Sequence, residues 1–204
     1  MAKHDKTEIG VSTILNPVPV VMVSSCGIAP EDKPNIMTVA WAGTVNSEPP
    51  MISISVRKER YSHRLITESG EFVVNLVTKS LCKACDYCGV KSGAREDKFK
   101  ACSLTPVKAS GLKYAYAIKE SPVSISCVVR NVVELGSHDM FIGEVRAVTC
   151  DSYLLDGNGK LCLDNAKLVA YNHGEYFLLG DKMGFFGYSV ASDDVIARRM
   201  EKKK

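Results

Sequence analysis

The sequence has no long apolar run and little net charge. No stretch approaches the roughly 20 apolar residues that span a bilayer, and the polar residues 1–7 lack the apolar core of a signal peptide. We therefore expect no membrane association and a cytoplasmic location. The net charge is only +3, so nothing demands nucleic acid as a partner, and the basic residues 198–204 are expected to form a solvated tail.

The motifs of several common enzyme classes are also missing. The glycine-containing residues 180–187 have the wrong spacing for a dinucleotide-binding fingerprint, and there is no Walker loop, His-Glu-x-x-His zinc helix or nucleophile elbow. With only four histidines, a hydrolytic triad has no support. If the protein is an enzyme, a bound cofactor must carry out the chemistry.

The eight cysteines are expected to be reduced, because no secretory signal accompanies them. Cys82, Cys85 and Cys88 form a C-x-x-C-x-x-C run that opens like a ferredoxin loop, but Ser92 occupies the fourth ligand position and no proline follows it. Residues 81–89 instead suit a short helix that places small cysteine side chains near one face. An iron–sulfur or zinc site is the alternative, and we expect no metal.

Short strand-like segments at hairpin spacing dominate the chain. They predict a mainly β protein, an antiparallel β-barrel with a few short helices, and 204 residues suit a single domain. The expected strands are residues 17–27, 36–45, 51–56, 72–77, 123–133, 140–150, 167–171 and 175–179.

We expect the function to lie in residues 35–64. Ser53, Ser55 and Arg57 share one face of a predicted strand, which is followed by a helix that starts at Ser62 and ends at Gly70. A helix N-terminus beside the planar fork of an arginine can bind a phosphate monoester. An exposed hairpin end with an ordinary helix cap is the alternative.

Three further features have open interpretations. Asn75, the one polar residue of a buried strand, either braces the backbone or faces a ligand. Residues 89–99 are predicted to be loop, either a lid or an ordinary surface loop. His138 lies in a predicted turn, where a histidine is most often solvated.

Several segments, in order, carry a family resemblance: residues 35–43 (NIMTVAWAG), 50–57 (PMISISVR), 61–62 (YS) and 71–76 (EFVVNL). The chain resembles the flavin reductase-like FMN-binding proteins, and within them the flavoredoxin branch. The resemblance covers about residues 16–189. It implies an FMN-binding split barrel, usually a homodimer with flavin sites at or near the subunit interface.

The resemblance also implies site residues. Arg57, Ser62 and the helix N-terminus at His63 would hold the FMN phosphate, and the main chain of residues 38–41 would lie along the isoalloxazine edge. Trp41 would be either a flavin-stacking residue or part of the core. The expected cofactor-binding residues are Asn35, Met37, Thr38, Val39, Ala40, Trp41, Ser53, Ser55, Arg57, Ser62, His63, Asn75, Lys98 and Phe99.

His138 is the one catalytic candidate. Its turn resembles the Gly-Asp-His turn of flavin reductases, whose histidine lies near the flavin or the nicotinamide, but Ser137 replaces the aspartate here. The leading hypothesis is a flavoredoxin-like protein that transfers electrons through noncovalent FMN to a redox protein partner. The alternatives are an NAD(P)H-dependent FMN reductase, with NADH or NADPH as donor, and a non-redox ligand-binding barrel.

Overall fold

The computed structural model describes residues 4–200, and its elements are mostly strands. The helices are α1 (Tyr61–Ser69), α2 (Cys82–Val90), α3 (Lys98–Ala101), α4 (Asp193–Met200) and the short 3-10 helices η1 (Ser152–Leu154), η2 (Leu163–Ala166) and η3 (Tyr188–Val190). The strands are β1 (Val18–Pro19), β2 (Val21–Ser25), β3 (Asn35–Val39), β4 (Ala42–Ser47), β5 (Pro50–Arg57), β6 (Glu71–Leu76), β7 (Pro106–Lys108), β8 (Tyr116–Ile118), β9 (Val123–Glu134), β10 (His138–Cys150), β11 (Val169–Asn172) and β12 (Glu175–Leu178).

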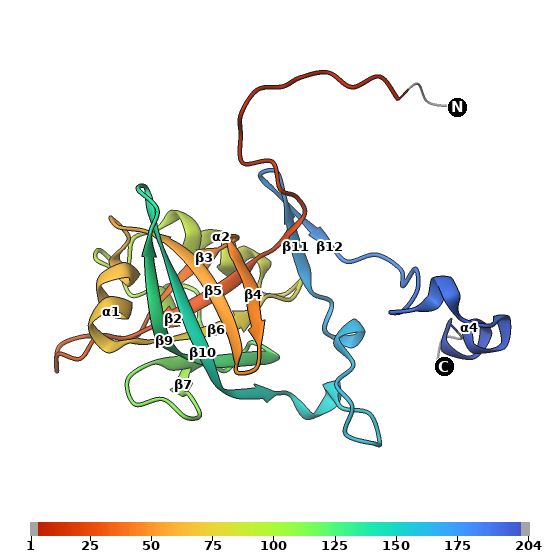
Figure 1. Ribbon diagram of the computed structural model, residues 1–204. Coiled ribbons are helices and arrows are strands. Elements are labelled where there is room, and N and C mark those ends of the chain that lie inside the picture. Colours follow the sequence, from red (N-terminus) through yellow and green to blue (C-terminus); the bar gives the residue numbers. More distant parts are fainter. Residues whose placement is uncertain (1–3, 201–204) are drawn as a thin grey trace.

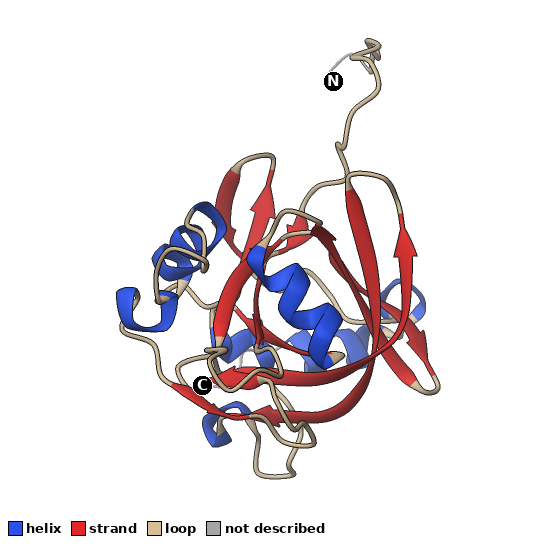
Figure 2. Cartoon of the chain, turned by 90° about the vertical axis from the view of Figure 1, so that its left-hand side faces the viewer, coloured by secondary structure: helices blue, strands red, loops and turns tan. Residues whose placement is uncertain are grey.

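The main sheet is antiparallel and has seven strands in the order β3-β2-β6-β9-β10-β5-β4. Its two end strands, β3 and β4, are separated in sequence only by Ala40 and Trp41. The sheet therefore curls until its ends approach each other, as Figures 1 and 2 show. The Trp41 carbonyl accepts a hydrogen bond from the Ser55 N–H at 2.9 Å across this junction. The predicted mainly β barrel is confirmed.

The predicted continuous strand over residues 36–45 is wrong, because the chain bends at Ala40–Trp41. The closing of the barrel requires a change of direction at this point. Local β-propensity cannot reveal such a bend, since both flanking segments are strands in their own right.

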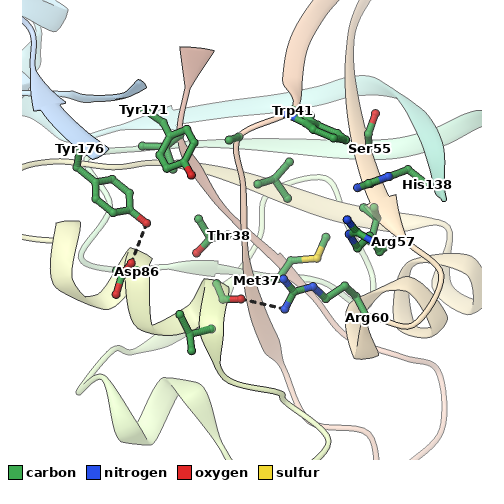
Figure 3. A pocket seen from close by; sticks show the side chains of 16 residues that line it. Met37, Thr38, Trp41, Ser55, Arg57, Arg60, Asp86, His138, Tyr171 and Tyr176 are labelled. Atoms are coloured by element: carbon green, nitrogen blue, oxygen red, sulfur yellow. Dashed lines mark hydrogen bonds between the residues drawn. The ribbon is translucent and has the colours of Figure 1, made fainter. Parts of the chain in front are cut away.

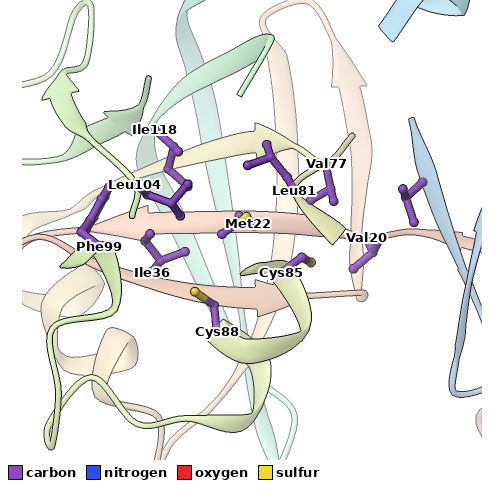
Figure 4. Close-up of a cluster of buried hydrophobic side chains, with 11 residues drawn as sticks. Val20, Met22, Ile36, Val77, Leu81, Cys85, Cys88, Phe99, Leu104 and Ile118 are labelled. Atoms are coloured by element: carbon purple, nitrogen blue, oxygen red, sulfur yellow. The ribbon is translucent and has the colours of Figure 1, made fainter. Parts of the chain in front are cut away.

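Strand β2 is buried on both faces, and its alternating side chains enter two different cores. Val21 and Val23 point into the barrel, where they pack with Phe72 and Phe141. Met22 belongs to the outer core, which packs beneath α2 and α3 together with the residues in Figure 4. The two short helices thus cover the outer face of β2 and β3.

Helix α1 ends where the sequence predicts, because Gly70 caps it in the left-handed conformation with φ 67°. It begins one residue early, at Tyr61, and Arg60 occupies the N-cap position without a side-chain capping bond. Ser62 is therefore not the cap. Its hydroxyl is buried and is used elsewhere.

Helix α2 confirms the helix predicted for the cysteine run. Cys85 and Cys88 are fully buried in the outer core, while Cys82 is partly buried. All eight cysteines are free thiols. Within residues 4–200, no three side chains of His, Cys, Asp or Glu are grouped so that they could hold a metal ion.

Two local predictions need correction. Residues 89–99 are not all loop, because α2 extends to Val90 and Lys98 starts α3, capped by the Asp97 carboxylate that accepts the Lys100 N–H at 3.1 Å. His138 is not in the turn. It is the first residue of β10, where pairing with β5 extends the strand beyond what local pattern indicates.

The chain leaves the barrel after β10, which ends at Cys150 (Figure 1). Strands β11 and β12 pair as predicted but join β1 in a separate three-stranded sheet. Arg198 and Arg199 lie in α4 rather than in a solvated tail, and residues 201–204 lie outside the described residues. Among residues 4–200, no helix is long and apolar enough to cross a membrane.

Candidate functional site

The bend between β3 and β4 opens onto a cavity of about 460 Å³, here called the wide cavity (Figure 3). Aromatic and apolar side chains make up much of its wall, with polar groups at its ends. Its lining residues are Val20, Met37, Thr38, Val39, Ala40, Trp41, Ser55, Val56, Arg57, Arg60, Asp86, Gly89, Val90, His138, Tyr171 and Tyr176.

A second cavity of about 330 Å³, here called the basic cavity, lies at the start of α1. Four of its residues are cationic and one is anionic, so a negatively charged ligand is favoured. Its lining residues are Asn35, Met37, Arg57, Glu59, Arg60, Tyr61, Ser62, Lys91, Ser92, Gly93 and Lys98. Met37, Arg57 and Arg60 line both cavities, which therefore adjoin.

Strand β3 contributes Met37, Thr38 and Val39 to the lining of the wide cavity. Strand β3 ends the seven-stranded sheet, so within the described residues one of its edges has no strand partner. The Thr38 hydroxyl donates to the Cys85 carbonyl and ties this strand to α2. Backbone N–H and C=O groups on an open edge can read the polar rim of a planar ligand.

Trp41 and His138 lie against each other beside the cavity, with ring centroids 4.6 Å apart and planes inclined by 43°. Trp41 is 46% exposed, so it is not a core residue. Its ring lines the cavity and offers a stacking surface.

His138 pairs across the sheet with Arg57, and the Ser137 hydroxyl lies 2.9 Å from its Nδ1 atom. Partial burial lowers the pKa of His138, and the positive charge of Arg57 lowers it further. The lowered pKa favours the neutral imidazole at pH 7. This form can accept or donate a hydrogen bond without adding charge to the wide cavity.

The opposite wall comes from α2 and the β11–β12 hairpin. The Tyr176 hydroxyl donates to the Asp86 carboxylate at 3.1 Å, and Tyr171 packs edge-to-face on Tyr176 with centroids 5.5 Å apart. Figure 3 shows both tyrosines across the cavity from His138 and Arg57. The cysteine-bearing helix thus faces the cavity with Asp86 and Gly89 and faces the core with its thiols.

Arginines form the boundary between the two cavities. Arg57 is about half exposed and lies 3.6 Å from the Glu59 carboxylate. Arg60 donates from Nη1 to the Gly89 carbonyl at 2.9 Å, a bond that links the start of α1 to the end of α2 (Figure 3). Both guanidinium groups therefore line the boundary with hydrogen-bonding capacity to spare.

Lys98 lies on the far side of the basic cavity and is only 3% exposed. Its Nζ atom donates to the Cys88 carbonyl at 2.8 Å. Burial lowers the pKa of Lys98, because desolvation disfavours the ammonium form. An anion in the basic cavity would offset this desolvation.

The floor of the basic cavity is closely packed. The Asn35 amide donates to the buried Ser62 hydroxyl at 2.7 Å. Gly93 lies so close that an added Cβ atom would be 2.0 Å from Asn35 Oδ1. Residue 93 must therefore be glycine for residues 91–93 to pack against this floor.

The structure does not place His63 in either cavity. Its N–H donates to the Arg60 carbonyl at 2.8 Å, because α1 begins one residue earlier than expected. Its Nε2 atom lies 2.8 Å from the buried Asp139 carboxylate, which Lys58 approaches to 3.4 Å. Burial alone would raise the pKa of Asp139, but the hydrogen bond with His63 and the nearby positive charge of Lys58 outweigh it and lower that pKa.

Asn75 also lies away from the cavities, and it braces the backbone. Its Nδ2 atom donates to the Met22 carbonyl at 3.0 Å, and its Oδ1 atom accepts from the Ile118 N–H at 3.0 Å and the Ser124 hydroxyl at 2.9 Å. The amide is fully buried and joins β2 and β9 of the main sheet to β8 of the separate β7–β8 sheet. This is the first of the two interpretations that the sequence left open.

Two more predicted residues line neither cavity. The Ser53 hydroxyl donates to the Gly43 carbonyl at 3.4 Å on the sheet surface, although Ser55 on the same face does reach the wide cavity. Phe99 packs in the outer core and is 4% exposed. The Phe99 ring, at the second position of α3, therefore points into the outer core, while its neighbour Lys98 lines the basic cavity.

The remaining predicted residues gather at the two cavities. Those at the wide cavity are Met37, Thr38, Val39, Ala40, Trp41, Ser55, Arg57 and His138, and those at the basic cavity include Asn35, Ser62 and Lys98. Sequence reasoning missed Arg60, although three cations within four residues (Arg57, Lys58 and Arg60) were a usable signal. It also missed Asp86, Tyr171 and Tyr176, for which no local signal exists.

A curled antiparallel sheet with a site at its junction defines the split barrel, a class of flavin-binding proteins. The family model described as "Flavin reductase like domain" matches residues 14–177 of this chain. The chain belongs to the flavin reductase-like family, so the family recognised in residues 35–76 is confirmed.

Similar solved structures and curated relatives agree with this family assignment. The flavoredoxin of Desulfovibrio vulgaris (Miyazaki F) is 32% identical with a TM-score of 0.83, covering 91% of this chain and 99% of that one. The flavoredoxin of Methanosarcina acetivorans is 28% identical with a TM-score of 0.80, covering 89% and 95%. A flavin reductase of Pseudomonas putida is 26% identical over 68% of this chain and 78% of its own.

Proposed function

We propose that the protein binds FMN noncovalently, with the phosphate in the basic cavity and the isoalloxazine ring in the wide cavity. The observation that carries this proposal is the junction of the two cavities at Met37, Arg57 and Arg60. FMN consists of a planar aromatic ring system linked to a phosphate monoester. The ring matches the aromatic wide cavity, and the phosphate matches the cationic basic cavity beside it. The similarity to two flavoredoxins and a flavin reductase supports a flavin as the ligand.

The basic cavity suits a phosphate. Arg57 and Arg60 can each present a planar fork to phosphate oxygens, and the buried Lys98 supplies a third positive charge. Tyr61 and Ser62 open α1, and the first N–H groups of a helix lack intrahelical acceptors. Riboflavin, which lacks the phosphate, would forgo all of these contacts.

The wide cavity suits the ring. Its volume of about 460 Å³ falls in the range of small-molecule sites, roughly 300–1,000 Å³. Trp41 offers a stacking surface, and the open edge of β3 offers main-chain hydrogen bonds. His138, whose lowered pKa favours the uncharged imidazole, lies beside Trp41.

Bound FMN supplies hydride and single-electron chemistry, so the chain needs no acid–base pair of its own. The residues described here hold the phosphate, orient the ring and set the polarity around it. Arg57 and Arg60 also add positive charge near the ring. This charge would favour the negatively charged form of a bound flavin over its neutral form.

We further propose a flavoredoxin-like role, in which the protein keeps its FMN and passes electrons to a redox protein partner. Similarity to two flavoredoxins over nearly the whole chain supports this role. The second candidate is an NAD(P)H-dependent FMN reductase. It is favoured by the Trp41–His138 pair beside the wide cavity, a neutral aromatic surface on which a nicotinamide ring could lie.

An absorbance spectrum of the purified protein, followed by anaerobic addition of NADH and then NADPH, tests these roles. Flavin bands that persist until dithionite is added are the expected result for the carrier. Rapid bleaching by either nucleotide would favour the reductase. A protein that shows no flavin bands even after incubation with FMN would overturn the flavin proposal and leave a non-redox barrel.

We propose a homodimer as the working assembly. The arm before β1 exposes Val11 and Leu15, and the segment around α4 exposes Met183, Phe186 and Val190. Both extend from the barrel in Figure 1, and large apolar side chains on extended arms favour burial against a second copy. Light scattering should give twice the chain mass of 22.2 kDa, and a monomer mass would contradict the proposal.

The single-domain organisation of residues 1–204 and the cytoplasmic location stay predictions. Limited proteolysis that leaves residues 16–189 as one resistant fragment would support the first. Cell fractionation in the source organism would test the second.

A further inference from the structure

Two cysteines outside the cavities lie in direct contact. The Sγ atoms of Cys88, in α2, and Cys102, which follows α3, are 4.0 Å apart. Cys88 is fully buried in the outer core (Figure 4), while Cys102 is partly exposed to solvent. One thiol of the pair can therefore meet a reagent, and the other lies within van der Waals contact of it.

The pair brackets the segment that walls the basic cavity. Residues 89–101 contain Lys91, Ser92, Gly93 and Lys98, all of which line this cavity. The Lys98 ammonium also donates to the carbonyl of Cys88 itself, at 2.8 Å. A covalent bond between the bracketing thiols would close this cavity wall into a ring.

We propose that Cys88 and Cys102 form a reversible disulfide on reaction with a low-molecular-weight disulfide, closing the segment that walls the basic cavity. The Cys102 thiolate attacks one sulfur of the small disulfide, whose S–S bond breaks and releases one small thiolate. The Cys88 thiolate then attacks the Cys102 sulfur, and the second small thiolate leaves. The two leaving thiolates take up the protons that the cysteines lost, so two protein thiols are oxidised and one small disulfide is reduced to two thiols.

The surroundings set the rate of this exchange. Burial raises the pKa of Cys88 to about 12, and burial also raises the pKa of Cys102. The positive charge of Lys98 acts in the opposite direction on both thiols. Because the thiolate is the attacking species, the exchange is slow at pH 7 and accelerates as the pH rises.

The effect on ligand exchange rests on the proposed FMN function. A disulfide across residues 89–101 restricts the opening of the wall that carries Lys91 and Lys98. Release of a phosphate ligand requires residues 89–101 to move away from the basic cavity. Oxidation therefore slows FMN release. Riboflavin, which would not occupy the basic cavity, is released at an unchanged rate.

The disulfide is tested without any flavin measurement. The full-length protein is incubated with oxidised glutathione at pH 8.5, free thiols are alkylated, and the peptides are analysed by mass spectrometry without reduction. We expect a Cys88–Cys102 linked peptide and the loss of both thiols. A stable glutathione adduct on Cys102 with Cys88 still alkylatable, or no reaction at either residue, would overturn the proposal.

Two variants sharpen the result. Cys102→Ser removes the partly exposed thiol and should abolish the linked peptide. Cys162→Ser removes a partly buried thiol outside the bracketed segment and should leave the linkage intact. A linkage that is equally abolished in both variants would contradict the assignment.

The effect on the cavity is a separate measurement. FMN release from oxidised and reduced protein is followed by the recovery of flavin fluorescence, and the oxidised form should release FMN severalfold more slowly. A linked peptide together with equal release rates would overturn only the effect on the cavity. Failure to bind FMN at all would overturn the proposed function while leaving the disulfide standing.

Discussion

The two adjoining cavities are assembled in different ways. Most of the basic cavity comes from two local segments, residues 57–62 and 91–98, and its character is electrostatic. The wide cavity draws on positions from Val20 to Tyr176 and depends on the closing of the barrel. A phosphate site can therefore be encoded by a strand end and a helix start, whereas a ring site requires the finished tertiary structure.

This difference predicts separable effects on two ligands. Substitutions in the basic cavity should weaken FMN and spare riboflavin, because only FMN carries a phosphate. Substitutions in the wide cavity should weaken both ligands alike, because both carry the same ring.

The largest separation is expected for Arg57→Ala. Hydrogen bonds to charged groups contribute about 1.5–3 kcal/mol, so FMN affinity should fall about 12- to 160-fold. Riboflavin affinity should fall much less, because Arg57 also lines the wide cavity but riboflavin has no phosphate. Quenching of flavin fluorescence measures both. Arg130→Ala, which removes an exposed arginine paired with Glu144 outside the cavities, is the matched control. Equal losses for FMN and riboflavin would remove Arg57 from phosphate binding.

A smaller and unselective effect is expected for Trp41→Ala. Loss of an aromatic contact costs about 0.5–1.5 kcal/mol, so both ligands should weaken by about 2- to 12-fold. The exposed Tyr153, which lines neither cavity, provides the control Tyr153→Ala. A loss confined to FMN would show that Trp41 does not contact the ring.

The smallest effect concerns the pH dependence of FMN affinity. Burial holds the pKa of Lys98 below its usual 10.5, and the protonated ammonium is the form that favours phosphate. FMN affinity should therefore fall as the pH rises through this lowered pKa, less steeply than about tenfold per pH unit, the slope for one proton. FMN affinity is measured at several pH values for the wild type and for Lys98→Met, and the slopes of affinity against pH are compared. An unchanged slope in the variant would exclude Lys98 as the titrating group.

The sequence predicted the parts of the site that depend on local periodicity. Arg57 could be found because alternate residues share a strand face, and the end of α1 could be found because Gly70 adopts the left-handed cap. The antiparallel barrel followed from hairpin spacing. The family resemblance added the main chain of residues 38–41.

Long-range contacts decided the remainder. The His63 ring turns to Asp139, 76 residues away, and a helix start alone does not specify that partner. Tyr176 meets Asp86 across 90 residues because the β11–β12 hairpin packs beside α2. Asn75 was recognised as a buried polar residue, but its acceptors and donors come from three other segments that only the folded sheet brings together.

The central claim is that FMN binds across the two adjoining cavities. A crystal structure from crystals soaked with FMN tests it most directly. We predict the phosphate within hydrogen-bonding distance of the Arg57 and Arg60 guanidinium groups, and the isoalloxazine ring in the wide cavity between Trp41 and the open edge of β3. A phosphate located in the wide cavity, or a flavin bound away from the junction of the two cavities, would contradict the account.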